Sequence, residues 1–125
     1  YPDPSDWQRD AWKQVHACLD DPAVREPLQT PAGGSLWREK RFEVILDGEW
    51  VTGTFDRVMV AADRALIVDF KTDSVVDEAA ARGRAEGYRP QIELYRRVLS
   101  MLTGLDPSSI QAVLIFTRLR MLVSA

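Results

Sequence analysis

Two short segments, residues 53–58 and 68–73, constrain this chain more than any other feature of its sequence. Asp56 follows an apolar stretch in the first segment, and Asp69 stands two residues before Lys71 in the second. Alternate side chains of a strand project to opposite faces, so Asp69 and Lys71 share one face. Burying a carboxylate and an ammonium in an apolar strand is costly unless they have a partner or a purpose. We interpret these residues as a metal-dependent phosphodiester site.

The composition fits one globular domain, since 46% of the 125 residues are hydrophobic and 28% are charged. The net charge of −3 argues against a generally basic nucleic-acid binder. However, residues 82–97 hold five arginines against two glutamates. Such a basic stripe is compatible with phosphate contacts. A solvated helix face explains each arginine equally well.

The chain has one cysteine, Cys18, and one histidine, His16. A single cysteine excludes an internal disulfide and suits the reducing cytoplasm. One Cys and one His make a zinc site of the usual kind improbable, so any metal is expected to be Mg²⁺ or Mn²⁺ held by oxygen atoms. We interpret His16 as a packing or surface residue in preference to a ligand. No apolar run approaches the roughly 20 residues that span a bilayer, so no membrane partner is expected.

The pattern of apolar residues and turn signals predicts an α/β fold, with a helical lead-in over residues 1–36 and a single core over 37–125. The Asp47-Gly48 dipeptide is a strong hairpin signal. The expected strands are 37–46, 49–60, 65–71, 110–116 and 118–123. The expected helices run from residue 5 or 6 to 19 and from 79 to 102, and an interruption of the second helix is expected near Gly87 or Pro90.

The two predicted hairpins set a register that brings acids together. If residues 47–48 and 62–63 are two-residue loops, Glu39 lies opposite Asp56, and Asp56 lies opposite Asp69. Directly opposed residues have Cβ atoms about 4.5–5.5 Å apart, so like charges placed there repel and require a cation. Lys71 lies two residues along on the same face. A bulge in either hairpin would spoil this alignment.

This arrangement suggests a role for each residue. Asp56 and Asp69 are the expected metal ligands, with the Phe70 carbonyl in reach and Glu39 as a further ligand, directly or through water. Lys71 is expected to orient the attacking water or to stabilise the developing charge. The opposing interpretation is a set of ordinary surface ion pairs, with Asp69 paired to Lys71 or Arg57, and Glu39 paired to Arg41.

A second feature lies on the long helix. Gln91 and Tyr95 are four residues apart, so they share one helix face with the apolar stripe that is expected to cover the sheet. A glutamine on that face requires hydrogen-bond partners. The combination of two acids, a lysine and this helical pair is much rarer than any of its parts.

Together these residues resemble the PD-(D/E)XK nuclease domain of the RecB/AddA type, found at the C-terminal end of UvrD-like superfamily 1 helicase–nucleases. The resemblance implies a mixed sheet of restriction-endonuclease type flanked by helices, and Mg²⁺-dependent cleavage of DNA, expected to be exonucleolytic. It also implies a helicase chain, a second helicase–nuclease subunit, and a role in double-strand break repair and recombination. The residues that carry it are Glu39, Gly53-Thr-Phe-Asp56-Arg57, Asp69-Phe-Lys71-Thr72 and Gln91-x-x-x-Tyr95. By position, Asp56 and Asp69 match the metal ligands, Lys71 the catalytic lysine, Glu39 an acid on the first strand, and Gln91 with Tyr95 the helical motif.

The chain departs from this family in one respect. Its members usually carry a metal-binding histidine upstream in a Gly…His-x-x-Leu context, which His16 lacks. We therefore expect the chain to be a piece of a longer protein, with that histidine before Tyr1 and weak activity in isolation. No Walker A glycine loop is present, so ATP hydrolysis would belong to another segment. Two alternatives stay open: an inactive nuclease-like domain that binds DNA or serves as a scaffold, and an unrelated α/β domain.

Overall fold

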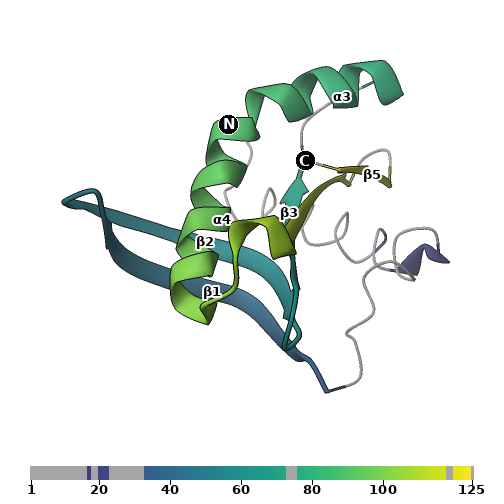
Figure 1. The fold of residues 1–125 in the computed structure, drawn as a ribbon. Coiled ribbons are helices and arrows are strands. Elements are labelled where there is room, and N and C mark those ends of the chain that lie inside the picture. Colours follow the sequence, from purple (N-terminus) through teal and green to yellow (C-terminus); the bar gives the residue numbers. More distant parts are fainter. Residues whose placement is uncertain (1–16, 18–19, 23–32, 73–75, 118–119, 125) are drawn as a thin grey trace, which may run out of the picture.

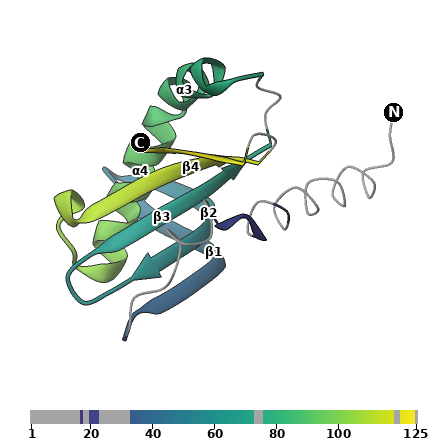
Figure 2. The ribbon, with the colours of Figure 1, turned by 90° about the vertical axis from the view of Figure 1, so that its right-hand side faces the viewer.

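A computed structural model describes residues 17, 20–22, 33–72, 76–117 and 120–124. Five strands form one sheet in the order β1-β2-β3-β4-β5. Figure 1 shows helices α3 and α4 on one side of this sheet, and Figure 2 shows the sheet from a direction 90° away. The elements are β1 Ser35–Leu46, β2 Glu49–Val60, β3 Ala65–Lys71, α3 Glu78–Gly87, α4 Arg89–Thr103, the 3₁₀ helix η2 Pro107–Ser109, β4 Ile110–Phe116 and β5 Met121–Ser124.

The sheet is mixed. The β1–β2, β2–β3 and β4–β5 pairs are antiparallel, whereas β3 and β4 are parallel. Parallel neighbours require a crossover connection, and α3 and α4 supply it here. A mixed sheet with crossover helices confirms the predicted α/β fold of restriction-endonuclease type.

Both predicted hairpins form. Asp47 and Gly48 adopt φ values of 52° and 81°, the left-handed pair that a two-residue turn between twisted strands requires. In the second turn the Ala61 N–H donates to the Arg64 carbonyl at 2.8 Å. The predicted pairing of β1 with β2 and of β2 with β3 is confirmed from Leu46↔Glu49 and from Val60↔Ala65 onward.

The two crossover helices follow each other directly and are interrupted where the sequence predicted. The Asp77 carboxylate caps α3 by accepting a hydrogen bond from the Ala80 N–H at 2.8 Å. The helix is interrupted at Tyr88. Pro90 then occupies the first turn of α4, where the missing N–H of proline costs no hydrogen bond. Gly104 ends α4 in the left-handed conformation with φ of 77°.

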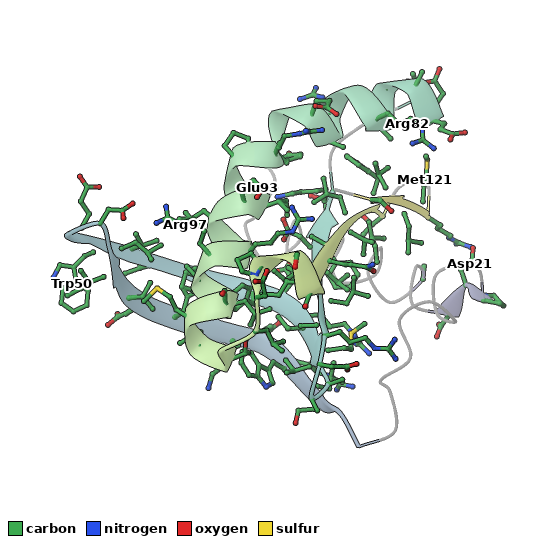
Figure 3. The ribbon with its side chains drawn as sticks, viewed as in Figure 1. Asp21, Trp50, Arg82, Glu93, Arg97 and Met121 are labelled. Carbon is green, nitrogen blue, oxygen red and sulfur yellow. The ribbon has the colours of Figure 1, made fainter. Side chains whose placement is uncertain are left out.

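The two faces of the sheet bury separate apolar clusters. The face under α3 and α4 holds most of the core, including Ile92, Leu99 and Phe116. The opposite face holds a smaller cluster of buried residues, Met59, Val68 and Ile115. Since β1 and β2 are longer than β3, their hairpin extends past this core, and Figure 3 shows Trp50 near its tip.

Several expectations fall outside the described residues. These are the N-terminal helix through residue 19 apart from residue 17, His16, Cys18, and most of the lead-in over 1–36. The last strand begins at Met121, later than residue 118, and residues 118–119 lie outside the described part. Within the described part, no helix combines the length and apolar character needed to cross a membrane.

Candidate active site

The predicted acids lie where β2 separates from β3. The ladder between these strands ends at Arg57↔Val68, one residue short of Asp56 and Asp69. Past that point the Asp56 side chain makes the connection, because its Oδ2 accepts a hydrogen bond from the Phe70 N–H at 2.9 Å. The carboxylate therefore satisfies a backbone donor of β3 just beyond the end of the ladder.

The separation coincides with a change of face in the β1–β2 hairpin. Trp37 in β1 packs on the helix side of the sheet, and so does Phe42, although they are an odd number of positions, five, apart. β2 shows the same change, because Phe55 and Val58 both join the helix-side core. Strict alternation cannot place either pair on one face. Glu39, with φ of 46°, lies at the change in β1.

This change of face corrects the predicted row of three acids. Arg38↔Arg57 and Lys40↔Phe55 keep the predicted register. Glu39 and Asp56, which lie between these two pairs, do not form a ladder pair. Glu39 is exposed, and the described residues contain no group of three or more potential ligands that could hold a metal ion. The structure thus brings two of the three acids together. The length of the turn sets which residues pair, but it does not determine the face to which a side chain points where the strand is kinked. A role for Glu39 through water stays a prediction.

The two aspartates form a closely coupled pair. Burial, followed by the hydrogen bond with Asp69 and the negative charge of Asp69, raises the pKa of Asp56 to about 7. The Phe70 N–H and the Lys71 ammonium oppose this shift only in part. Asp69 itself is buried, with 6% of its surface exposed. Two carboxylates in such surroundings favour either a shared proton or a bound cation.

Lys71 lies against this pair and is held from three sides. Its Nζ atom is 2.7 Å from Asp69 Oδ2 and donates to Gln91 Oε1 at 2.9 Å. It also lies 3.9 Å from the centre of the Tyr88 ring, in a cation–π contact. The ion pair with Asp69 lacks hydrogen-bond alignment, so Asp69 Oδ2 remains a buried acceptor without a hydrogen bond. A carboxylate oxygen has more than one lone pair, so Oδ2 can take a further ligand beside the ammonium.

The predicted helical pair extends this network. Gln91 Nε2 donates to the Tyr95 hydroxyl at 3.2 Å. The Tyr95 ring packs edge-on against Phe42 and Phe55, with centroids 5.7 Å and 5.3 Å apart. Burial, followed by the charge of Asp69, raises the pKa of Tyr95, so its hydroxyl stays protonated. Gln91 therefore contacts Lys71 directly, and Tyr95 connects the network to the aromatic core.

Two contributors escaped the sequence analysis. Nothing in the sequence singles out Tyr88, yet its ring lies over Lys71. Phe42 was an ordinary strand residue, yet it supports Tyr95. The one available signal was Gly53, which lies directly across from Phe42 and leaves room for an aromatic ring.

The donor set fits a hard divalent cation. Asp56 and Asp69 offer adjacent carboxylates, and Asp69 Oδ2 is buried without a hydrogen bond. Mg²⁺ is typically held by one or two carboxylates while it keeps several waters, and Mn²⁺ accepts the same ligands. The Phe70 carbonyl as a third ligand stays a prediction.

Comparison with known proteins agrees with this chemistry. A family model described as the PD-(D/E)XK nuclease superfamily matches residues 1–123, nearly the whole chain. No curated protein matches the chain.

Proposed function

Because the chain belongs to the PD-(D/E)XK nuclease superfamily, we propose that it hydrolyses phosphodiester bonds of DNA with Mg²⁺ or Mn²⁺ held by Asp56 and Asp69. The observation that carries this proposal is the half-buried Asp56 carboxylate next to the buried Asp69 carboxylate, with Lys71 Nζ 2.7 Å from Asp69 Oδ2. An ordinary surface ion pair would be exposed and would not adjoin a second acid. When bound, the ion supplies an activated water and neutralises charge on the phosphate.

The protein residues divide the remaining work. Lys71 is held by Gln91 and the Tyr88 ring, so its ammonium keeps a defined position beside the acids. From there it can orient the attacking water and stabilise the negative charge that grows on the phosphate oxygens. Asp56 fixes the β3 backbone through the Phe70 N–H while it presents its carboxylate to the site.

A finer assignment rests on the resemblance to the RecB/AddA type. We propose that the domain is of the RecB/AddA type and acts as an exodeoxyribonuclease in the cytoplasm, joined to a helicase chain and a second subunit in double-strand break repair and recombination. The alternative is an inactive domain that binds DNA or serves as a scaffold. The complete set, with Asp69 adjoining Asp56 on one side and ion-paired to Lys71 on the other, favours the active form.

The first test measures cleavage of end-labelled DNA and calorimetric Mn²⁺ binding in three variants. Asp69→Asn removes a ligand, so we expect Mn²⁺ binding to be lost and cleavage to fall by about 10²-fold or more. Lys71→Met should lose cleavage to a similar extent. It should keep or strengthen Mn²⁺ binding, because the ammonium no longer competes for Asp69 Oδ2.

The matched control is Asp63→Asn, since Asp63 is exposed in the β2–β3 turn and carries the same chemical change. It should leave binding and cleavage unchanged. Mn²⁺ binding without cleavage by the wild-type protein would favour the inactive alternative. Mn²⁺ binding that survives Asp69→Asn would refute the assignment of the site.

A further inference from the structure

Two arginines lie directly opposite each other in the β1–β2 hairpin, next to the candidate active site. Arg38 and Arg57 form a cross-strand pair. Arg38 is two residues from Leu36, and Arg57 is two residues from Met59. Both apolar residues belong to the cluster on the face away from the helices. Like charges placed directly opposite destabilise a sheet. A pair of cations in this position therefore calls for a compensating anion.

The described residues offer this pair no acidic partner, in contrast to several other arginines. Burial, followed by the charge of Arg38, lowers the pKa of Arg57, as expected of a cation beside another cation. Arg57 Nε is buried and has no acceptor. Arginines that have a carboxylate within ion-pair distance include Arg41, Arg82, Arg89, Arg96 and Arg97.

The position of the pair relates it to the acids. Arg57 follows Asp56 directly, so their Cα atoms lie about 3.8 Å apart. Asp69 and Lys71 act on the Asp56 carboxylate, whereas Arg38 is the charged group that acts on Arg57, so a phosphate held by Arg57 is not the one that the water at the acids attacks. β1 is the edge strand of the sheet, and Arg38 on it is exposed, which leaves the pair accessible to a ligand. A guanidinium matches a phosphate with two parallel hydrogen bonds.

We propose that Arg38 and Arg57 form a second phosphate site, which holds a DNA phosphate flanking the scissile one. This inference rests on the proposed nuclease function, because it takes the ligand to be the substrate strand. Its consequence is that the pair contributes to DNA affinity and register and leaves the chemical step to the acids and Lys71.

The test is the salt dependence of DNA binding, measured by fluorescence anisotropy in EDTA so that no strand is cut. The logarithm of the DNA association constant falls linearly with the logarithm of the salt concentration. Each lost phosphate contact makes this slope less steep, by about 0.9 for duplex DNA and about 0.7 for a single strand. We expect that reduction in Arg38→Gln and in Arg57→Gln. The matched control is Arg41→Gln, an exposed arginine of the same strand that pairs with Glu43, and its slope should stay at the wild-type value.

A second readout separates a lost contact from a lost fold. Removing one of two opposed charges should leave the denaturant midpoint of Arg57→Gln unchanged or higher. Pyrophosphate should raise the melting temperature of the wild type and of Arg41→Gln, and should raise it less in either pair variant. Unchanged salt slopes in folded pair variants would overturn the inference while leaving the nuclease function intact.

The two hypotheses fail in different ways. If pyrophosphate stabilises the protein through the pair but the wild type does not bind DNA, the site holds another phosphate ligand and the assignment to DNA is wrong. If DNA binds through the pair but is never cut in Mg²⁺ or Mn²⁺, the second site stands and the enzymatic proposal fails.

Discussion

Asp56 shows how one residue can serve both fold and site. Its carboxylate accepts a hydrogen bond from a β3 backbone donor and adjoins a second buried acid. The first contact stabilises the end of the ladder, whereas the second costs free energy whenever both acids are ionised. The cation that we propose for this site would remove that cost, and unfavourable electrostatics of this kind are common at functional sites.

The raised pKa of Asp56 predicts how stability depends on pH without metal. The carboxyl titrates near 3.8 in the unfolded chain and at about 7 in the folded protein, so the folded protein holds a proton that the unfolded chain releases. The contribution of this group to the free energy of unfolding is therefore full below pH 4 and is lost as pH rises to about 7. Asp56→Asn should remove that loss and stabilise the protein at pH 8 by roughly 1–3 kcal/mol.

Urea unfolding at pH 5 and pH 8 in EDTA measures this difference. The matched control Asp63→Asn removes an exposed carboxyl and should not alter the pH dependence. If Asp56→Asn destabilises the protein equally at both pH values, the residue acts chiefly through its hydrogen bond and the repulsion is unimportant.

At the scale of elements, the β1–β2 hairpin supports the helix that positions Lys71. The Phe42 ring lies over Gly53, and a Cβ added there would come within 2.6 Å of the ring. The same ring packs against Phe55 and Tyr95, and Tyr95 accepts the hydrogen bond from the glutamine that holds the lysine. The hairpin is also joined to α4 by an ion pair, in which Arg97 Nη2 lies 3.0 Å from Asp47 Oδ2 (Figure 3 labels Arg97).

Gly53→Ala should therefore displace the Phe42 ring. We expect a loss of about 1–3 kcal/mol in the free energy of unfolding, the usual cost of overpacking, together with reduced cleavage as the support of Tyr95 shifts. The matched control is Gly83→Ala in helix α3, where an added Cβ meets nothing within 4 Å. That change should stabilise the protein by about 0.5–1 kcal/mol, because alanine is a better helix former than glycine.

Chemical denaturation of both alanine variants, followed by cleavage assays, checks this prediction. A Gly53→Ala protein as stable and active as the wild type would show that the ring moves aside freely and does not support the site.

At the scale of the whole molecule, the site forms where an antiparallel hairpin meets a parallel pair. Asp56 comes from the hairpin, Asp69 and Lys71 from β3, and Gln91 from the crossover helix. β4 secures the end of β3, since the Thr117 N–H donates to the Lys71 carbonyl at 3.0 Å. Binding at such a junction couples to the stability of the entire domain.

Metal binding should therefore raise the melting temperature, and the rise should depend on pH. A cation must displace the proton that Asp56 holds below about pH 7, so the shift from a fixed Mn²⁺ concentration should be larger at pH 8 than at pH 6. Differential scanning fluorimetry at both pH values measures it, with Asp69→Asn as the variant that should show no shift. An equal shift at both pH values would argue against Asp56 as a ligand.

Local signals were sufficient to predict the elements and most of the pairing. Asp47-Gly48 specified one hairpin, Pro90 and Gly87 placed the helix break, and alternation put Asp69 beside Lys71, because each of these depends on a few neighbouring residues. Spacing along one helix likewise paired Gln91 with its tyrosine.

Only the tertiary structure decided which acids meet and what holds the lysine. The neighbours of Glu39 and Asp56 keep the register that the turn predicts, yet these two acids form no ladder pair, because the hairpin changes face at this point and Glu39 stays exposed. The contacts of Tyr88 with Lys71 and of Phe42 with Tyr95 join elements far apart in the chain. Sequence by itself determines periodicity, turns and residue chemistry, since these are local. The kink of a strand and the partners across a core depend on how all the elements pack together, so no single segment encodes them.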